Sequence, residues 1–347
     1  MPANELRKDY ILDRWVVIAS QRRRRPSDFV AGVRMHVGGG LCPFCPGNEH
    51  LTPPATLLYV FEDGELKKAR DEDGNRRRDW IVRCIPNLYP AFMPPESGAA
   101  QSPRIEHHYV SMDALGYHEV LVESPNHDEH PGVARISQLT LVINALRDRY
   151  SFFMGKDYVR YVSIFRNHGA SAGASLSHAH SQIIATPIIP SILGEEMAAS
   201  EKYYEERGRC IFCEIIDMEA RSERFIWEND RFIVFAPWAP TNPFEFWIFP
   251  KRHQSTILEL TEDEIRRLAE ALKVSLGGLR SLLNDPPYNY GFHMVPEKYY
   301  HWHVEVYPKL AIWAGFEKST GIYINTMPPE EAARSLREAF KKEEELI

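Results

Sequence analysis

Four of the five cysteines in this 347-residue sequence form two Cys-x-x-Cys pairs, and 14 histidines accompany them. Cys42 and Cys45 lie in CPFC, Cys210 and Cys213 lie in CIFC, and Cys84 stands alone. Thiolates and imidazoles are the usual ligands of structural zinc, and a tetrahedral site needs four of them. In a reducing compartment, paired cysteines predict a metal site before they predict a disulfide.

The histidines that complete such sites follow each cysteine pair in the same order. Each pair precedes a single histidine, a predicted helix and a His-x-His: His127, His178 and His180 in the first series, and His253, His301 and His303 in the second. This order, occurring twice, indicates an internal duplication. The predicted zinc ligands are Cys42, Cys45, His127 and His178 in the first half, and Cys210, Cys213, His253 and His301 in the second.

His180 is a candidate nucleophile. Residues i and i+2 of a strand point to the same face, so a metal-bound His178 would hold the strand while His180 faces a cleft. A neutral imidazole is a good nucleophile, and a hydrogen bond at one ring nitrogen decides which nitrogen attacks. His180 as a further metal ligand is the alternative. The small residues 169–175 precede this segment and allow close approach of the backbone to an anion.

The elements that must position these residues predict an α+β fold of two duplicated histidine-triad-like halves, each with antiparallel strands and one main helix. Alternating or continuous apolar runs predict strands at 15–19, 118–123, 158–165, 182–185, 246–250 and 299–307, and a hairpin at 57–78. Helices are predicted at 136–153, 328–347 and from the capping box at 261–264 to about 283. We divide the chain into residues 1–190, with the nucleophile and first zinc site, and 191–347, with the second metal site.

The composition excludes several classes of function. There are 41 Lys and Arg against 48 Asp and Glu, a net charge of −7, which argues against general binding of nucleic acid or of acidic membranes. A local basic run at 22–25 still suits a small phosphate. The sequence has no long apolar run, signal peptide, P-loop or dinucleotide fingerprint, so we expect a cytoplasmic protein that uses neither nucleoside triphosphate hydrolysis nor redox chemistry.

Over nearly its whole length the chain resembles the galactose-1-phosphate uridylyltransferase family of the histidine-triad superfamily. The most specific segments are CPFCPG, GYHEVLVESPNH and FRNHGASAGASLSHAHSQ. The family's His-Pro-His-x-Gln core reads His-Ala-His-Ser-Gln at 178–182 here, which keeps the spacing and replaces proline with Ala179.

The resemblance implies that His180 attacks the α-phosphorus of a nucleotide sugar and passes the nucleotidyl group to a second sugar phosphate. It assigns Gln182 and Ser175 to the phosphoryl group. It also implies a homodimer, in which two arginines reach substrate phosphate across the interface. The substrate-binding positions that it implies are Arg22, Arg25, Asn87, Asn167, Phe316 and Glu317. Leu88 stands where many relatives have an acidic residue.

Three functions remain open at this point. The first is uridylyl transfer between UDP-glucose and galactose 1-phosphate. The second is a nucleotide-sugar phosphorylase, for example of ADP-glucose, in which phosphate is the acceptor, with water as a minor alternative. The third is a zinc- and nucleotide-binding protein without catalysis.

The second metal site also has two forms. We favour zinc on the Cys2His2 set, which leaves His303 free. Some relatives instead use a glutamate with three histidines, which would be Glu196, His293, His301 and His303 here, and the metal there is zinc or iron.

Overall fold

The structure is a computed structural model that describes residues 4–20, 26–29, 41–72, 74–95 and 103–347. Its centre is a sheet of eleven strands in which every neighbouring pair is antiparallel. In spatial order the strands are β11 (Phe225–Glu228), β12 (Phe232–Phe235), β13 (Phe246–Pro250), β15 (His303–Pro308), β14 (Tyr288–His293), β9 (Tyr161–His168), β10 (His180–Thr186), β8 (Tyr117–Val122), β5 (Trp80–Pro86), β3 (Leu57–Glu62) and β4 (Glu65–Ala69).

The order of the strands repeats about the middle of the sheet. The run β5-β8-β10-β9 in the first half corresponds to β12-β13-β15-β14 in the second, and β9 pairs with β14 where the halves meet. The predicted α+β class, with duplicated halves and an antiparallel sheet, is confirmed. One sheet therefore passes through both halves, and the boundary between residues 190 and 191 stays a prediction.

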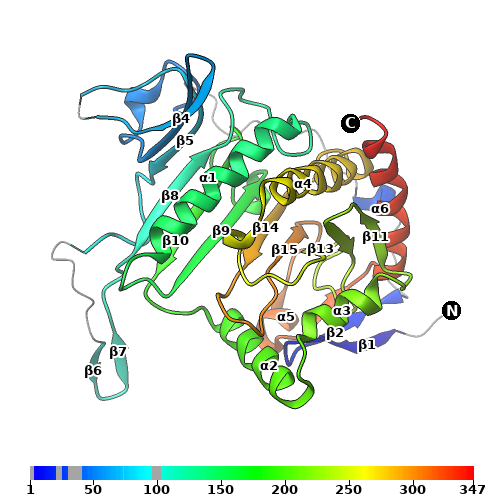
Figure 1. Cartoon of the computed structure of the whole chain (residues 1–347). Coiled ribbons are helices and arrows are strands. Elements are labelled where there is room, and N and C mark those ends of the chain that lie inside the picture. Colours follow the sequence, from blue (N-terminus) through cyan, green and yellow to red (C-terminus); the bar gives the residue numbers. More distant parts are fainter. Residues whose placement is uncertain (1–3, 21–25, 30–40, 73, 96–102) are drawn as a thin grey trace.

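Helices cover one face of this sheet (Figure 1). They are α1 (Ile136–Met154), α4 (Glu262–Leu283) and α6 (Pro329–Glu344). Because side chains alternate along a strand, Leu121 and Ile183 enter the main apolar core with α1. Val120, the neighbour of Leu121, belongs to a separate cluster on the other face. The histidine side chains that begin β10 and β15 lie on that second face.

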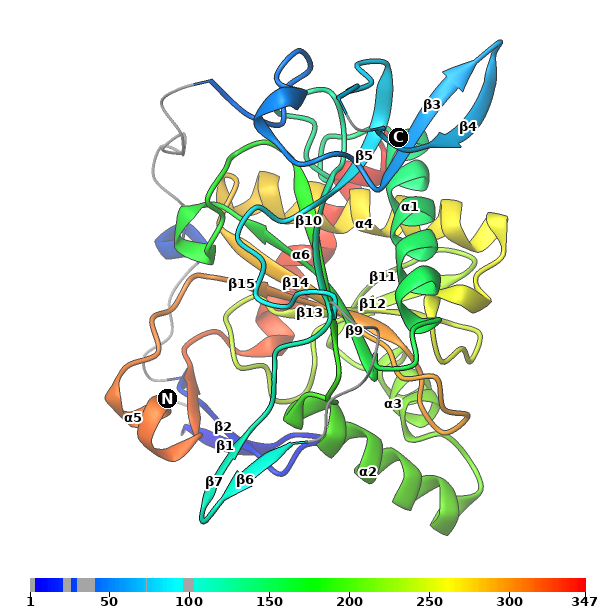
Figure 2. The same ribbon diagram turned by 90° about the vertical axis from the view of Figure 1, so that its left-hand side faces the viewer.

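Smaller elements surround the sheet. Strands β1 (Glu5–Lys8), β2 (Trp15–Ile18) and β16 (Tyr323–Asn325) form a three-stranded sheet, in which β16 runs parallel to β2. The hairpin of β6 (Arg104–Glu106) and β7 (Tyr109–Ser111) projects from the body of the molecule in Figure 1 and reaches the lower edge of the molecule in Figure 2. The remaining helices are α2 (Ser191–Arg207), α3 (Ile211–Glu219) and α5 (Gly315–Thr320). In the described part of the chain, no helix has both the length and the apolar character needed to cross a membrane.

Two predicted strands differ from the structure by three residues or more at one or both ends. The strand expected at 158–165 runs from Tyr161 to His168, because a turn occupies the residues before it and pairing with β14 extends its end. The strand expected at 299–307 begins only at His303. Helices α2 and α3 were not predicted. On α2 only Leu193, Glu196 and Ser200 are buried, so its sequence lacks a regular apolar stripe.

Candidate functional site

The first cysteine pair meets its predicted histidines between three segments of the chain. Cys42 and Cys45 lie in the turn before β3, His127 follows β8, and His178 precedes β10. Their ligand atoms all lie within 4.8 Å of one another. Both imidazoles turn Nδ1 towards sulfur, since Cys45 Sγ is 3.4 Å from Nδ1 of His127 and 3.6 Å from Nδ1 of His178.

These distances fit a tetrahedral zinc ion. Zinc bonds of about 2.3 Å to sulfur and 2.0–2.1 Å to nitrogen place neighbouring sulfur and nitrogen ligands about 3.5 Å apart at the tetrahedral angle. The outer ring nitrogens are also bonded, because His178 Nε2 donates to the Ser124 carbonyl at 2.8 Å and His127 Nε2 lies 2.9 Å from Ser177 Oγ. Such partners hold Nδ1 towards the ion. Burial lowers the pKa of His178 to about 4, which keeps its imidazole neutral for binding.

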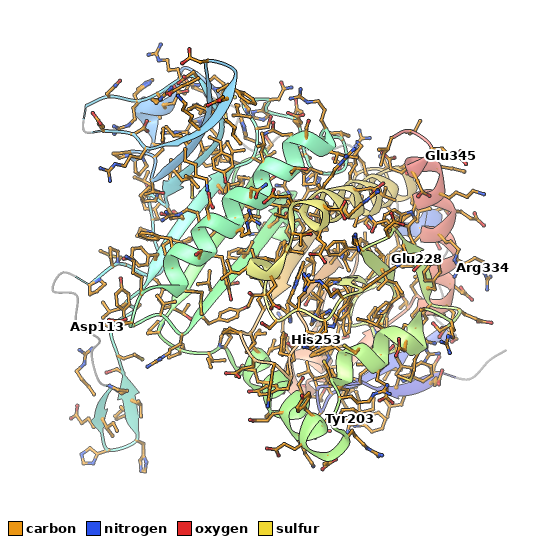
Figure 3. All side chains as sticks on the ribbon, in the orientation of Figure 1. Asp113, Tyr203, Glu228, His253, Arg334 and Glu345 are labelled. Atoms are coloured by element: carbon orange, nitrogen blue, oxygen red, sulfur yellow. The ribbon has the colours of Figure 1, made fainter. Side chains whose placement is uncertain are left out.

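The second cluster has the same construction in the other half. Cys210 lies at the start of α3, Cys213 lies in its first turn, and the labelled His253 lies beside this helix (Figure 3). Cys213 Sγ is 3.3 Å from Nδ1 of His253 and 3.5 Å from Nδ1 of His301. A hydrogen bond from Cys213 and the nearby His253 lower the pKa of Cys210 to about 5. This donor set fits zinc equally well.

A third group contains the remaining residues of the alternative metal set. Ligand atoms of Glu196, His293 and His303 lie within 4.8 Å of one another, whereas His301 joins the cysteines. Burial opposes protonation of His293, but the carboxylates of Glu196 and Glu305 outweigh it and raise the pKa of His293 to about 9. The structure thus separates His301 from the other three residues of that set.

His180 begins β10 on the face of the sheet opposite α1. Its Nδ1 lies 2.7 Å from the carbonyl oxygen of His178, which can only accept, so Nδ1 carries the proton. The Nε2 lone pair is then the nucleophilic atom. Burial lowers the pKa of His180 below its usual 6.5, so the ring is neutral at pH 7. The carbonyl group of His178 therefore links the first cysteine–histidine cluster to the orientation of the His180 imidazole.

A cavity of about 260 Å³ lies in front of His180. Gln182, Ser175 and Asn87, three of the predicted site residues, line it together with His180. Apolar side chains such as Phe44 form much of the remaining wall. A larger cavity of about 750 Å³ shares Pro86 and Asn87 with the first and is otherwise lined by different residues, among them His118 and Glu119 of β8. The first cavity thus combines an imidazole, two carboxamides and hydroxyl-bearing side chains with an apolar wall.

Other predicted substrate residues lie elsewhere. Asn167 is the penultimate residue of β9, and Asn289 Nδ2 of β14 donates to its Oδ1 at 2.8 Å. Phe316 and Glu317 lie on α5 and do not line the cavity of His180. Arg22 and Arg25 lie outside the described residues. The substrate-binding roles of all five residues stay predictions.

No sequence motif indicated the buried ion pair that supports the His-x-His segment. On the opposite face of β10, Ser181 Oγ donates to Glu123 Oε1 at 2.6 Å. Glu123 forms a buried ion pair with Arg166, whose Nη1 also donates to the His180 carbonyl at 3.0 Å. These contacts hold the backbone of the candidate nucleophile, and they depend on strand pairing that no local motif encodes.

Comparison with known proteins gives consistent matches. A family model described as "Domain of unknown function (DUF4921)" matches residues 126–345. The ADP-glucose phosphorylase of Arabidopsis thaliana is 35% identical over 96% of this chain and 92% of its own length. The galactose-1-phosphate uridylyltransferase of Thermotoga maritima is 30% identical over 96% of this chain and 98% of its own.

Solved structures agree with these sequence matches. The crystal structure of the Arabidopsis thaliana ADP-glucose phosphorylase with bound ADP-glucose superposes with a TM-score of 0.79 at 32% identity. The match covers 96% of this chain and 99% of that one. A structure of a uridylyltransferase superposes with a TM-score of 0.74 at 29% identity and covers 97% of this chain and 99% of that one.

Proposed function

Because this chain belongs to the galactose-1-phosphate uridylyltransferase family of the histidine-triad superfamily, we propose that it transfers a nucleotidyl group from a nucleotide sugar through His180. One observation supports this most strongly. The bond from Nδ1–H to the His178 carbonyl leaves the Nε2 lone pair of a neutral imidazole, at a cavity that Gln182 also lines. A scaffold protein would need neither group.

The reaction consists of two balanced displacements. In the first, Nε2 of His180 forms a bond to the α-phosphorus, and the phosphorus–oxygen bond to the sugar 1-phosphate breaks. The leaving phosphate keeps the electron pair. In the second, a phosphate oxygen of the acceptor attacks the same phosphorus, and the nitrogen–phosphorus bond breaks. Gln182 and Ser175 would stabilise the phosphoryl oxygens by hydrogen bonds.

Zinc on the two Cys2His2 sets would be structural, since four protein ligands complete its tetrahedron. At the first site, Cys42, Cys45, His127 and His178 would bind the ion. The His178 carbonyl would then be fixed by its own ligand side chain, and with it the proton on Nδ1 of His180. We also propose a homodimer, which would allow Arg22 and Arg25 of a second copy to reach the substrate.

UDP-glucose and galactose 1-phosphate are the substrates that we propose first. The phosphorolysis of ADP-glucose is the second candidate, supported by the 35% identity to an ADP-glucose phosphorylase over most of the chain. Leu88 lines the cavity beside Asn87, at a position where many relatives have an acidic residue. This difference also favours a nucleotide other than the uridine nucleotide of those relatives.

An exchange assay separates the candidates. The purified protein is incubated with UDP-glucose or ADP-glucose, and either galactose 1-phosphate or inorganic phosphate is supplied as acceptor. Uridylyl transfer predicts UDP-galactose from the first combination. Phosphorolysis predicts ADP and glucose 1-phosphate from ADP-glucose and phosphate. Absence of exchange with every donor and acceptor would exclude both.

A further inference from the structure

His118 lies on β8, diagonally across from Gln182 on the neighbouring strand. The pairing of β8 with β10 places Gln182 opposite Val120 and His118 opposite Ile184. Residues two positions apart share a face, so the side chains of His118 and Gln182 meet on the face that carries His180. His118 Nε2 lies 2.8 Å from Gln182 Oε1.

The position of the proton on His118 follows from its other partner. The backbone N–H of Ala91 donates to His118 Nδ1 at 3.1 Å. A backbone amide can only donate, so Nδ1 is the unprotonated nitrogen and the neutral ring carries its proton on Nε2. That N–H therefore donates to Gln182 and selects its oxygen. The amide group of Gln182 must then turn its NH2 away from His118.

The proton on His118 Nε2 also affects the carboxamide of Asn87. Its Oδ1 accepts from the Tyr89 N–H at 2.9 Å, which leaves its NH2 3.1 Å from His118 Nε2. Two donors cannot bond to each other, so the NH2 groups of Asn87 and Gln182 both stay available in a cavity that both residues line. An anionic ligand there would find two amide donors and no amide oxygen.

We propose that His118 is a positioning residue for the nucleotidyl transfer: its Nε2–H fixes the carboxamide of Gln182 so that the NH2, and not the oxygen, meets the phosphoryl group. This inference rests on the proposed function. A reversed Gln182 would place a partial negative charge against the phosphoryl oxygens, where the transition state needs a donor. The backbone amide of Ala91 thus determines which nitrogen of His118 carries the proton, and that proton orients the carboxamide of Gln182.

Two substitutions at position 118 separate positioning from general support of the strand. In His118→Gln the terminal NH2 lies four bonds from Cα, as Nε2 does in histidine, so a donor to Gln182 remains. In His118→Asn the side-chain oxygen can still accept from Ala91, but no donor reaches Gln182. The two variants are both uncharged amides, and each serves as the control for the other.

The experiment measures the rate at which sugar 1-phosphate is released in the first turnover. We expect His118→Asn to slow this step up to about tenfold, because one orienting hydrogen bond is lost. His118→Gln should stay within about threefold of the parent. Gln182→Ala, which removes the donor itself, should cost about 100-fold, and adding His118→Asn to it should cost nothing further.

Each outcome decides the inference. Equal losses in the two position-118 variants, or independent losses that multiply in the double variant, would overturn the role of His118 while leaving nucleotidyl transfer intact. A parent protein that releases no sugar 1-phosphate from any nucleotide sugar would overturn both. Thermal melting of the variants should not distinguish Asn from Gln, whereas the rate should.

Discussion

The buried ion pair beneath the His-x-His segment allows a quantitative test of stability. Glu123 and Arg166 expose only 2% and 1% of their side chains. Glu123 also accepts from Ser181, and Arg166 also donates to the His180 carbonyl. The substitution Glu123→Gln keeps the shape and the hydrogen-bond acceptor but removes the charge. It leaves the Arg166 cation in a dry interior without its counter-charge.

Removing one partner of a buried ion pair costs about 3–5 kcal/mol. That is a large part of the 5–15 kcal/mol that separates a typical native protein from its unfolded state. In urea, with a slope of about 3 kcal/mol per molar for a chain of this size, the midpoint should fall by about 1–1.7 M. The slope itself should not change, because the surface exposed on unfolding is the same.

A matched exposed pair supplies the control. Arg231 and Asp263 lie 2.8 Å apart with more than half of each side chain exposed, so Arg231→Gln should cost less than about 1 kcal/mol. Replacing both buried charges together, as Glu123→Leu with Arg166→Met, should recover much of the loss. A midpoint for Glu123→Gln that falls no further than that for Arg231→Gln would refute the reasoning.

Three further predictions concern metal, packing and pH. Cys45→Ser should lower the zinc content from two ions per chain to one, measured by elemental analysis of the purified protein; two retained ions would contradict the assignment. Gly278→Ala should destabilise by about 1–3 kcal/mol, because the new methyl group would overlap an aromatic ring of α6, whereas Gly194→Ala, with open space around it, should not; equal melting temperatures would count against the packing. A hydrogen bond from Arg252 lowers the pKa of Glu264 from 4.5 to about 2, so its stabilisation is present above pH 4.5 and is lost as the pH falls towards 2. Unfolding of Glu264→Gln should therefore depend less on pH in that range, and an unchanged pH dependence would contradict it.

Local motifs predicted the composition of both clusters. A Cys-x-x-Cys places two thiolates on one turn, and a histidine in the same order in each half completes the set. The structure brings these eight residues together in two groups of four. The antiparallel sheet and its main helices followed from apolar periodicity, and α4 begins at the predicted Thr261 cap and ends at Leu283.

Contacts that depend on strand register could not be predicted. His118 and Gln182 are far apart in the sequence, and a shift of one residue between β8 and β10 would place them on opposite faces. The Glu123–Arg166 pair likewise joins the residue after β8 to β9. Helix α2 was not predicted for another reason. Its sequence is largely polar, and its few buried residues do not form an apolar stripe.

The mass of the intact protein tests the central claim most directly. The chain is mixed with UDP-glucose or ADP-glucose without an acceptor, quenched, and weighed beside His180→Ala. Nucleotidyl transfer predicts a gain of one uridylyl or adenylyl group on the parent chain, located on His180 by peptide mapping and absent from the variant. An unchanged mass with both donors, or an adduct that persists in His180→Ala, would contradict the account.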